Sequence, residues 1–140
     1  MTRAIRVLFG AMLISFHARA DLVGFVGCMV LRRSAEVVVL PDYPQSAISR
    51  GVAGIVVVQV RYGPGPTVNS VRVLDAPDQE TASATVEAVK KWKFRTPPIA
   101  STKGPGEKSG RLIFYFRIVN GKPAVVDAAG EAMRTSPNPK

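Results

Sequence analysis

The distribution of histidine limits the chemistry that this chain can perform. Its only histidine, His17, lies in an N-terminal stretch with the form of a cleavable export signal. Removal of that stretch leaves no imidazole, which excludes Ser-His-Asp and Cys-His nucleophilic sites and removes the commonest metal ligand. The acidic residues are scattered and contain no Ca²⁺-loop pattern, so we predict no metal site.

Paired carboxylates are the remaining candidates for acid and base catalysis. Asp75 with Asp78 or Glu80 is the nearest grouping, but capping of a helix explains these acids. The stretch from Gly104 to Ser109 contains glycines and a lysine, yet an acid intervenes and the spacing of a phosphate-binding loop fails. We therefore expect a protein that is not an enzyme, with no catalytic residue and no cofactor.

Residues 1–20 are predicted to be a signal peptide that is cleaved on export. Two arginines supply a positive start, and an unbroken apolar run follows from Val7 to Phe16. Ala18 and Ala20 then form an A-x-A cleavage site before Asp21.

Two alternatives stay open for this part of the chain. A second apolar run, Leu22 to Leu31, follows closely and raises the alternative of an uncleaved membrane anchor, although each run has ten residues where a spanning helix needs about 20. Lipidation of Cys28 is the other, because Gly27 is the small residue that a lipobox places before its cysteine. A free buried thiol is the simpler interpretation.

The charge of the chain favours anionic partners. Formal net charge is +9, and removal of residues 1–20 deletes three arginines and no acid, leaving 16 bases against 10 acids, or +6. Such a charge suits anionic lipid, cell-wall polymer or an acidic protein segment, while a solvated basic surface explains it equally well. Nucleic acid is not expected as a partner of an exported protein.

The positions of proline, glycine and other turn-forming residues mark one folded unit over residues 41–127. An apolar segment or linker over residues 21–40 precedes it, and a flexible tail over residues 128–140 follows. Within the unit we expect a short helix over residues 45–50, a valine-rich strand over 55–62, a Gly-Pro turn and a second strand over 68–74.

A second helix and a further strand are predicted in the second half of the unit. Asp78 is placed to cap a helix that reaches Trp92, and a basic, proline-containing loop follows it. The clearest strand comes next, over residues 111–119. Asn120-Gly121 then indicates a type I′ turn, so residues 124–126 can fold back as a short fourth strand.

The order of these signals resembles the C-terminal domain of TonB, the energy transducer of bacterial outer-membrane transport. The likeness covers about residues 41–120 and is carried by four stretches, Pro41–Pro44, Gly51–Gly54, Val71–Leu74 and Val86–Phe94. The resemblance implies an α+β fold, with two helices packed on a three-stranded antiparallel sheet, and no catalytic activity.

The resemblance also implies a binding site. In that family the last strand of the sheet offers its edge to an extended receptor segment, the TonB box. Carried onto this chain, the protein-binding residues are Tyr43, Pro44, Leu112, Ile113, Phe114, Tyr115, Phe116, Arg117, Ile118 and Val119. If residues 124–126 pair with the same strand, that edge is already occupied.

The leading expectation is a periplasmic, non-catalytic domain that binds extended segments of outer-membrane receptors or other envelope proteins by strand addition. The first alternative is an energy transducer anchored in the inner membrane and facing the periplasm, with inner-membrane motor proteins as partners. A second alternative is a basic envelope domain that binds anionic lipid or cell-wall polymer.

Overall fold

The computed structural model describes residues 27–95 and 107–135. The predicted signal peptide, most of the basic loop and residues 136–140 lie outside this part. The first described element is a helix over residues 27–34. It is followed by β1 (Ala35–Val37), α2 (Gln45–Ser49), β2 (Gly54–Tyr62), β3 (Val68–Asp75), α3 (Gln79–Lys90), β4 (Lys93–Phe94), β5 (Lys108–Val119), β6 (Lys122–Asp127) and α4 (Ala128–Thr135).

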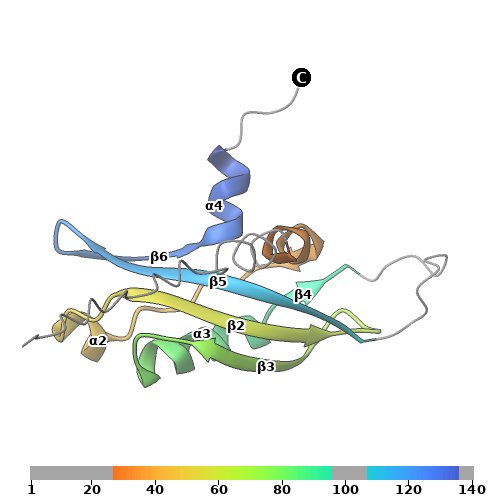
Figure 1. The fold of residues 1–140 in the computed structure, drawn as a ribbon, viewed down its shortest axis with the longest axis horizontal. Coiled ribbons are helices and arrows are strands. Elements are labelled where there is room, and N and C mark those ends of the chain that lie inside the picture. The colour runs from red at the N-terminus through yellow and green to blue at the C-terminus, as the bar shows by residue number, and fades with distance from the viewer. Residues whose placement is uncertain (1–26, 96–106, 136–140) are drawn as a thin grey trace, which may run out of the picture.

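Four antiparallel strands form the main sheet in the order β3-β2-β5-β6 (Figure 1). Strands β1 and β4 form a separate two-stranded sheet. The prediction of an α+β fold with an antiparallel sheet is confirmed. The fourth strand does form, and it is six residues long where the sequence indicated three.

The turn between β5 and β6 follows from its two residues. Asn120 and Gly121 both have positive φ, 52° and 72°, which is the backbone of a type I′ turn. This turn has the twist of the strands that it joins, so β6 pairs with β5 directly from Val119↔Lys122 onward.

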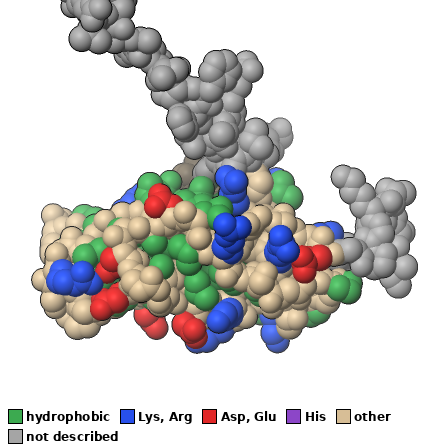
Figure 2. All heavy atoms as spheres, turned by 60° about the horizontal axis from the view of Figure 1, so that its bottom comes forward, with side chains coloured by type: hydrophobic (Ala, Val, Ile, Leu, Met, Phe, Trp, Pro, Cys, Tyr) green, Lys and Arg blue, Asp and Glu red, His purple; other side chains and the backbone are tan. Residues whose placement is uncertain are grey.

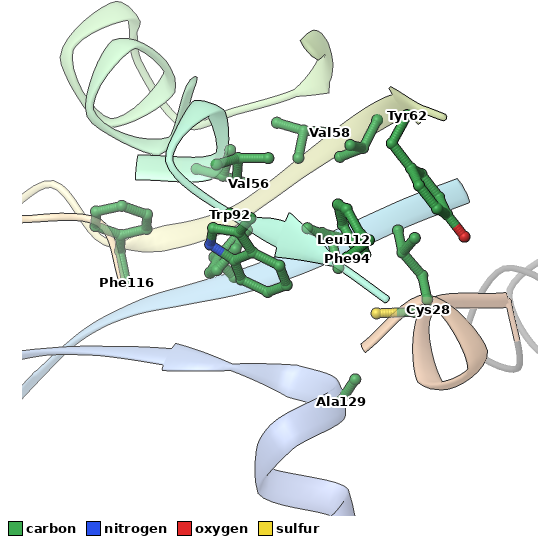
Figure 3. Close-up of a cluster of buried hydrophobic side chains, with 13 residues drawn as sticks. Cys28, Val56, Val58, Tyr62, Trp92, Phe94, Leu112, Phe116 and Ala129 are labelled. Atoms are coloured by element: carbon green, nitrogen blue, oxygen red, sulfur yellow. The ribbon is translucent and has the colours of Figure 1, made fainter. Parts of the chain in front are cut away.

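The core lies on one face of the sheet, where alternate residues of β2 and β5 are buried. Val56, Val58 and Leu112 are fully buried in one cluster with Trp92 (Figure 3), and the fully buried Phe114 meets the Trp92 ring edge-on. The indole Nε1 donates to the Val39 carbonyl oxygen at 2.8 Å, so the one polar atom of this large side chain is satisfied.

Helix α3 covers the β2–β3 side of this core (Figure 1). Asp78 caps it as predicted, since its carboxylate accepts from the Thr81 backbone N–H at 2.9 Å. The buried face of this helix consists of Thr81, Ala82, Thr85, Ala88 and Val89, and Val86 is half-buried. Trp92 lies just after the helix end rather than within it.

The helix over residues 27–34 and helix α4 cover the β5–β6 side. Cys28 and Leu31 of the first, and Ala128 and Ala129 of the second, are buried. Figure 3 shows Cys28 and Ala129. The segment interpreted as a linker therefore contains a helix and a strand, and the tail predicted to be flexible begins with a helix over residues 128–135. Within the described ranges no helix has the length and apolarity needed to cross a bilayer.

Candidate protein-binding edge of the sheet

Strand β5, the predicted binding strand, lies inside the sheet. Its residues 108–116 pair with β2 on one side, and residues 114–119 pair with β6 on the other. Residues 124–126 do pair with this strand as part of β6, so β6 already occupies its edge. A partner that pairs with β5 over residues 114–119 has to displace β6.

The predicted binding residues of β5 divide between the two faces of the sheet. Leu112, Phe114 and Phe116 are at most 1% exposed and belong to the core, so a partner cannot reach their side chains. On the opposite face Tyr115 is half-buried, and the Arg117 guanidinium lies over its ring, with Cζ 4.7 Å from the ring centroid. Of the other three, Ile113 and Ile118 are half-buried and Val119 is 55% exposed.

Of Tyr43 and Pro44, the two predicted binding residues before α2, Tyr43 lies against β5. The Tyr43 ring meets Phe116 edge-on, with centroids 5.1 Å apart at 78°, and its hydroxyl donates to the Val52 carbonyl oxygen. Burial, and secondarily the charge of Asp78, raises the pKa of Tyr43. Both residues are half-buried, and the contacts of Tyr43 fix the entry to α2 against the sheet.

The outer strand β6 presents its own edge. A two-residue hairpin loop is closed by a hydrogen-bonded pair, here Val119↔Lys122, and the pairs alternate from there along an antiparallel ladder. The backbone N–H and C=O groups of Val125 and Asp127 therefore point away from β5. Pro123 has the same outward orientation, so its missing N–H costs β6 no bond to β5.

Beyond the end of β6, Cys28 of the 27–34 helix packs against β5. Its buried thiol interacts with the backbone N–H groups of Ile113 on β5 and Ala129 on α4. Burial is the main cause that raises the pKa of this thiol to about 11; the two hydrogen bonds act in the opposite direction. The side chain is thus an uncharged packing group at the junction of two helices and a strand (Figure 3).

A cleft of about 440 Å³ lies along the C-terminal half of β6. The 27–34 helix, residues 38–40, β6 and α4 line it. Arg32 Nε donates to Asp127 Oδ2 at 2.6 Å in its wall, while Asp127 Oδ1 is buried with no hydrogen-bond partner among the described residues. A Cβ at Gly130 would lie 2.6 Å from Asp127 Oδ2, so a larger residue here would push this carboxylate from its ion pair with Arg32.

Metal chemistry has no support in the part of the chain that the structure describes. No group of three or more histidine, cysteine, aspartate or glutamate side chains gathers there in a way that could hold an ion. The Asp78 and Glu80 carboxylates, considered for acid and base roles, both accept from Arg50 Nη2, at 2.7 Å and 3.1 Å, and Asp78 also caps α3. These contacts are structural.

The fold and this edge define a small α+β domain whose sheet ends in an added hairpin strand. The family model described as Gram-negative bacterial TonB protein C-terminal matches residues 39–118, more than half of the chain. The chain belongs to this TonB C-terminal domain family, which is non-catalytic, is located in the cell envelope and generally binds outer-membrane TonB-dependent receptors. No curated protein and no solved structure matches the chain.

Proposed function

We propose that this chain is a periplasmic module that binds extended segments of outer-membrane transport proteins by adding a strand at the β5–β6 end of its sheet. The observation that carries the proposal is where the family match ends. It stops at residue 118, one residue before the end of β5, so β6 and α4 lie outside it. β6 therefore occupies the edge at which, by the family resemblance, a receptor segment adds.

The packing of β6 supports an exchange of this strand for a partner. Its first three residues are exposed, Val125 and Val126 are half-buried, and only Asp127 is buried. An incoming strand would replace the main-chain bonds of β6 one for one, so the side-chain contacts of Val125 to Asp127 would account for most of the cost. These residues form a small part of the core.

Backbone NMR tests the proposal by titrating the protein with N-terminal segments of outer-membrane receptors. The expected result is a set of shifts on β5 and β6, with the β5 amides that point toward β6, those of Tyr115, Arg117 and Val119, among them. No shift on either strand at millimolar segment would refute strand addition. A matched control is each segment with its residue order scrambled.

The location in the periplasm is tested by mass spectrometry of the native protein. A mature N-terminus at Asp21 supports an exported, cleaved domain. An intact Met1 or Thr2 in the inner-membrane fraction would instead assign the chain as an anchored transducer that works with motor proteins.

A second candidate function, attachment to an anionic surface, is favoured by one feature of the sheet. On the face opposite the core, Arg72, Gln59 and Arg111 are neighbours across β3, β2 and β5; Arg61 lies further along β2 and is paired with Glu107 at 3.5 Å. In the view of Figure 2, acidic side chains lie among the basic ones, so the face seen there is not uniformly basic. Binding to anionic vesicles that falls steeply with salt and is lost in an Arg72→Gln, Arg111→Gln double variant would support this candidate.

A further inference from the structure

The outer edge of β6 and the cleft beside it indicate a site that the strand exchange does not use. We propose that this edge and cleft together bind an extended peptide of a partner protein that carries a carboxylate close to an aliphatic side chain. The inference rests on the proposed function, because it concerns the same strand addition. It differs in that β6 stays in place and the peptide becomes a fifth strand.

The backbone of β6 provides the first part of the site. Val125 directs its N–H and C=O away from β5, and Asp127 directs its N–H the same way, since the Asp127 C=O belongs to the first turn of α4; both residues line the cleft. An extended segment laid along this edge can pair with these groups, while Pro123 has no N–H to offer and ends the pairing in that direction. The usable edge is therefore the half of β6 that opens into the cleft.

The walls of the cleft provide the second part. Val38, Leu40, Val125 and Met133 make its surface largely apolar, and Leu40 is 48% exposed. Side chains of an added strand point alternately to the two faces of the sheet. An aliphatic side chain on the face of Val125 would enter the cleft and cover Leu40, which supplies affinity from apolar burial.

Charge provides the third part and sets the chemistry of the partner. The Arg32 charge is matched by Asp127, whereas no described carboxylate lies within ion-pair distance of Arg134 on the same cleft. The surplus is positive, so a peptide carboxylate is complementary to Arg134.

The test uses two acetylated peptides of nine residues, in which valine and threonine alternate. One has a central glutamate and the other a central glutamine, and both carry the same neutral ethylene-glycol tail. The full-length mature protein, its Arg134→Gln variant and its Val125→Pro variant are titrated by calorimetry. Hydrogen exchange of the Val125 and Asp127 amides is followed by NMR.

The proposal predicts that the glutamate peptide binds the unmodified protein about threefold to fivefold more tightly than the glutamine peptide. This preference disappears in Arg134→Gln. Val125→Pro, which removes an outward N–H and leaves the β5 pairing intact, weakens both peptides about tenfold. The Val125 and Asp127 amides become protected on binding, while the β5–β6 bonds persist.

Three results would overturn it. The first is binding with no preference that depends on Arg134. The second is release of β6 from β5 on binding, since this is exchange and not addition. The third is a protein that dimerises in the absence of peptide and whose Val125 and Asp127 amides are then protected. This would assign the edge to a second copy of the chain. If Val125→Pro does not fold, the Arg134 comparison and the amide protection still decide.

The receptor-segment titration separates this inference from the proposed function. Receptor segments that bind on β5 and release β6 would sustain the proposed function; designed peptides that fail to bind the cleft of the same protein would then overturn the fifth-strand site alone. Designed peptides that bind the cleft while receptor segments bind nowhere would sustain the fifth-strand site and overturn the proposed function.

Discussion

Replacement of Gly121 by alanine tests whether β6 can leave the sheet independently of the rest of the domain. Gly121 has φ +72°, and a Cβ there would meet nothing within 4 Å. The substitution therefore strains the backbone of the turn without causing a clash. A residue other than glycine in this region costs about 1 kcal/mol, which lowers the population of paired β6 about fivefold relative to the open state.

This shift has opposite consequences for the two ways of binding. A partner that replaces β6 binds only the open state, so its apparent Kd falls about fivefold in Gly121→Ala, as long as β6 remains mostly paired. A partner that adds to the outer edge of β6 needs the paired state, so its Kd is unchanged or rises. Calorimetry with receptor segments and with the glutamate peptide measures both effects on one pair of proteins.

Hydrogen exchange checks whether β6 opens independently of the rest of the domain. The amides of Arg117 and Val119 point toward β6 and should exchange about fivefold faster in Gly121→Ala, whereas the amides of Phe114 and Phe116 point toward β2 and should not change. Equal acceleration of all four amides would mean that β6 opens only when the whole domain unfolds. The reasoning about strand exchange would then be refuted.

Three further outcomes are expected. Asp78→Ala should lower the free energy of unfolding by about 1 kcal/mol, because the Thr81 N–H loses its cap, while Asp78→Asn keeps the cap. Hydrogen bonds from Thr81, aided by Arg50, hold the pKa of the Asp78 carboxyl below its ordinary 3.8. Its stabilisation is therefore complete above about pH 4 and lost as pH falls through the folded-state pKa, and urea titrations of Asp78→Asn should lack this acid decline. Trp92→Phe should cost about 1–3 kcal/mol in the same assay, because the Val39 carbonyl loses its donor; no loss would mean that water replaces the indole. The Cys28 thiol, with its pKa raised to about 11, should resist alkylation at about pH 8 in the folded protein and react in concentrated urea.

The elements with strong local signals could be predicted from the sequence. Asp78 is a good cap whatever packs around it, and Asn120-Gly121 dictates a type I′ turn through backbone sterics alone. The alternation in β2 and β5 shows directly which residues face the core. In each case the physical cause lies within a few residues of its effect.

The parts that sequence reasoning missed depend on distant contacts. The 27–34 helix and α4 were not predicted as helices of the domain, and each has only a turn or two of apolar residues. Their buried members, Cys28 and Ala129, meet each other and β5 only in the folded chain. The cleft was missed for the same reason, because Arg32 and Asp127 are 95 positions apart.

The short outer strand β6 also limits aggregation at its side of the sheet. An open sheet edge is a template on which unrelated chains can aggregate. Here Pro123 blocks one position, Lys122 adds a charge at the hairpin tip, and α4 turns away directly after Asp127. The edge left over at β6 is only a few bonds long and lies against a helix, so a long flat strand finds no continuous surface on this side of the sheet.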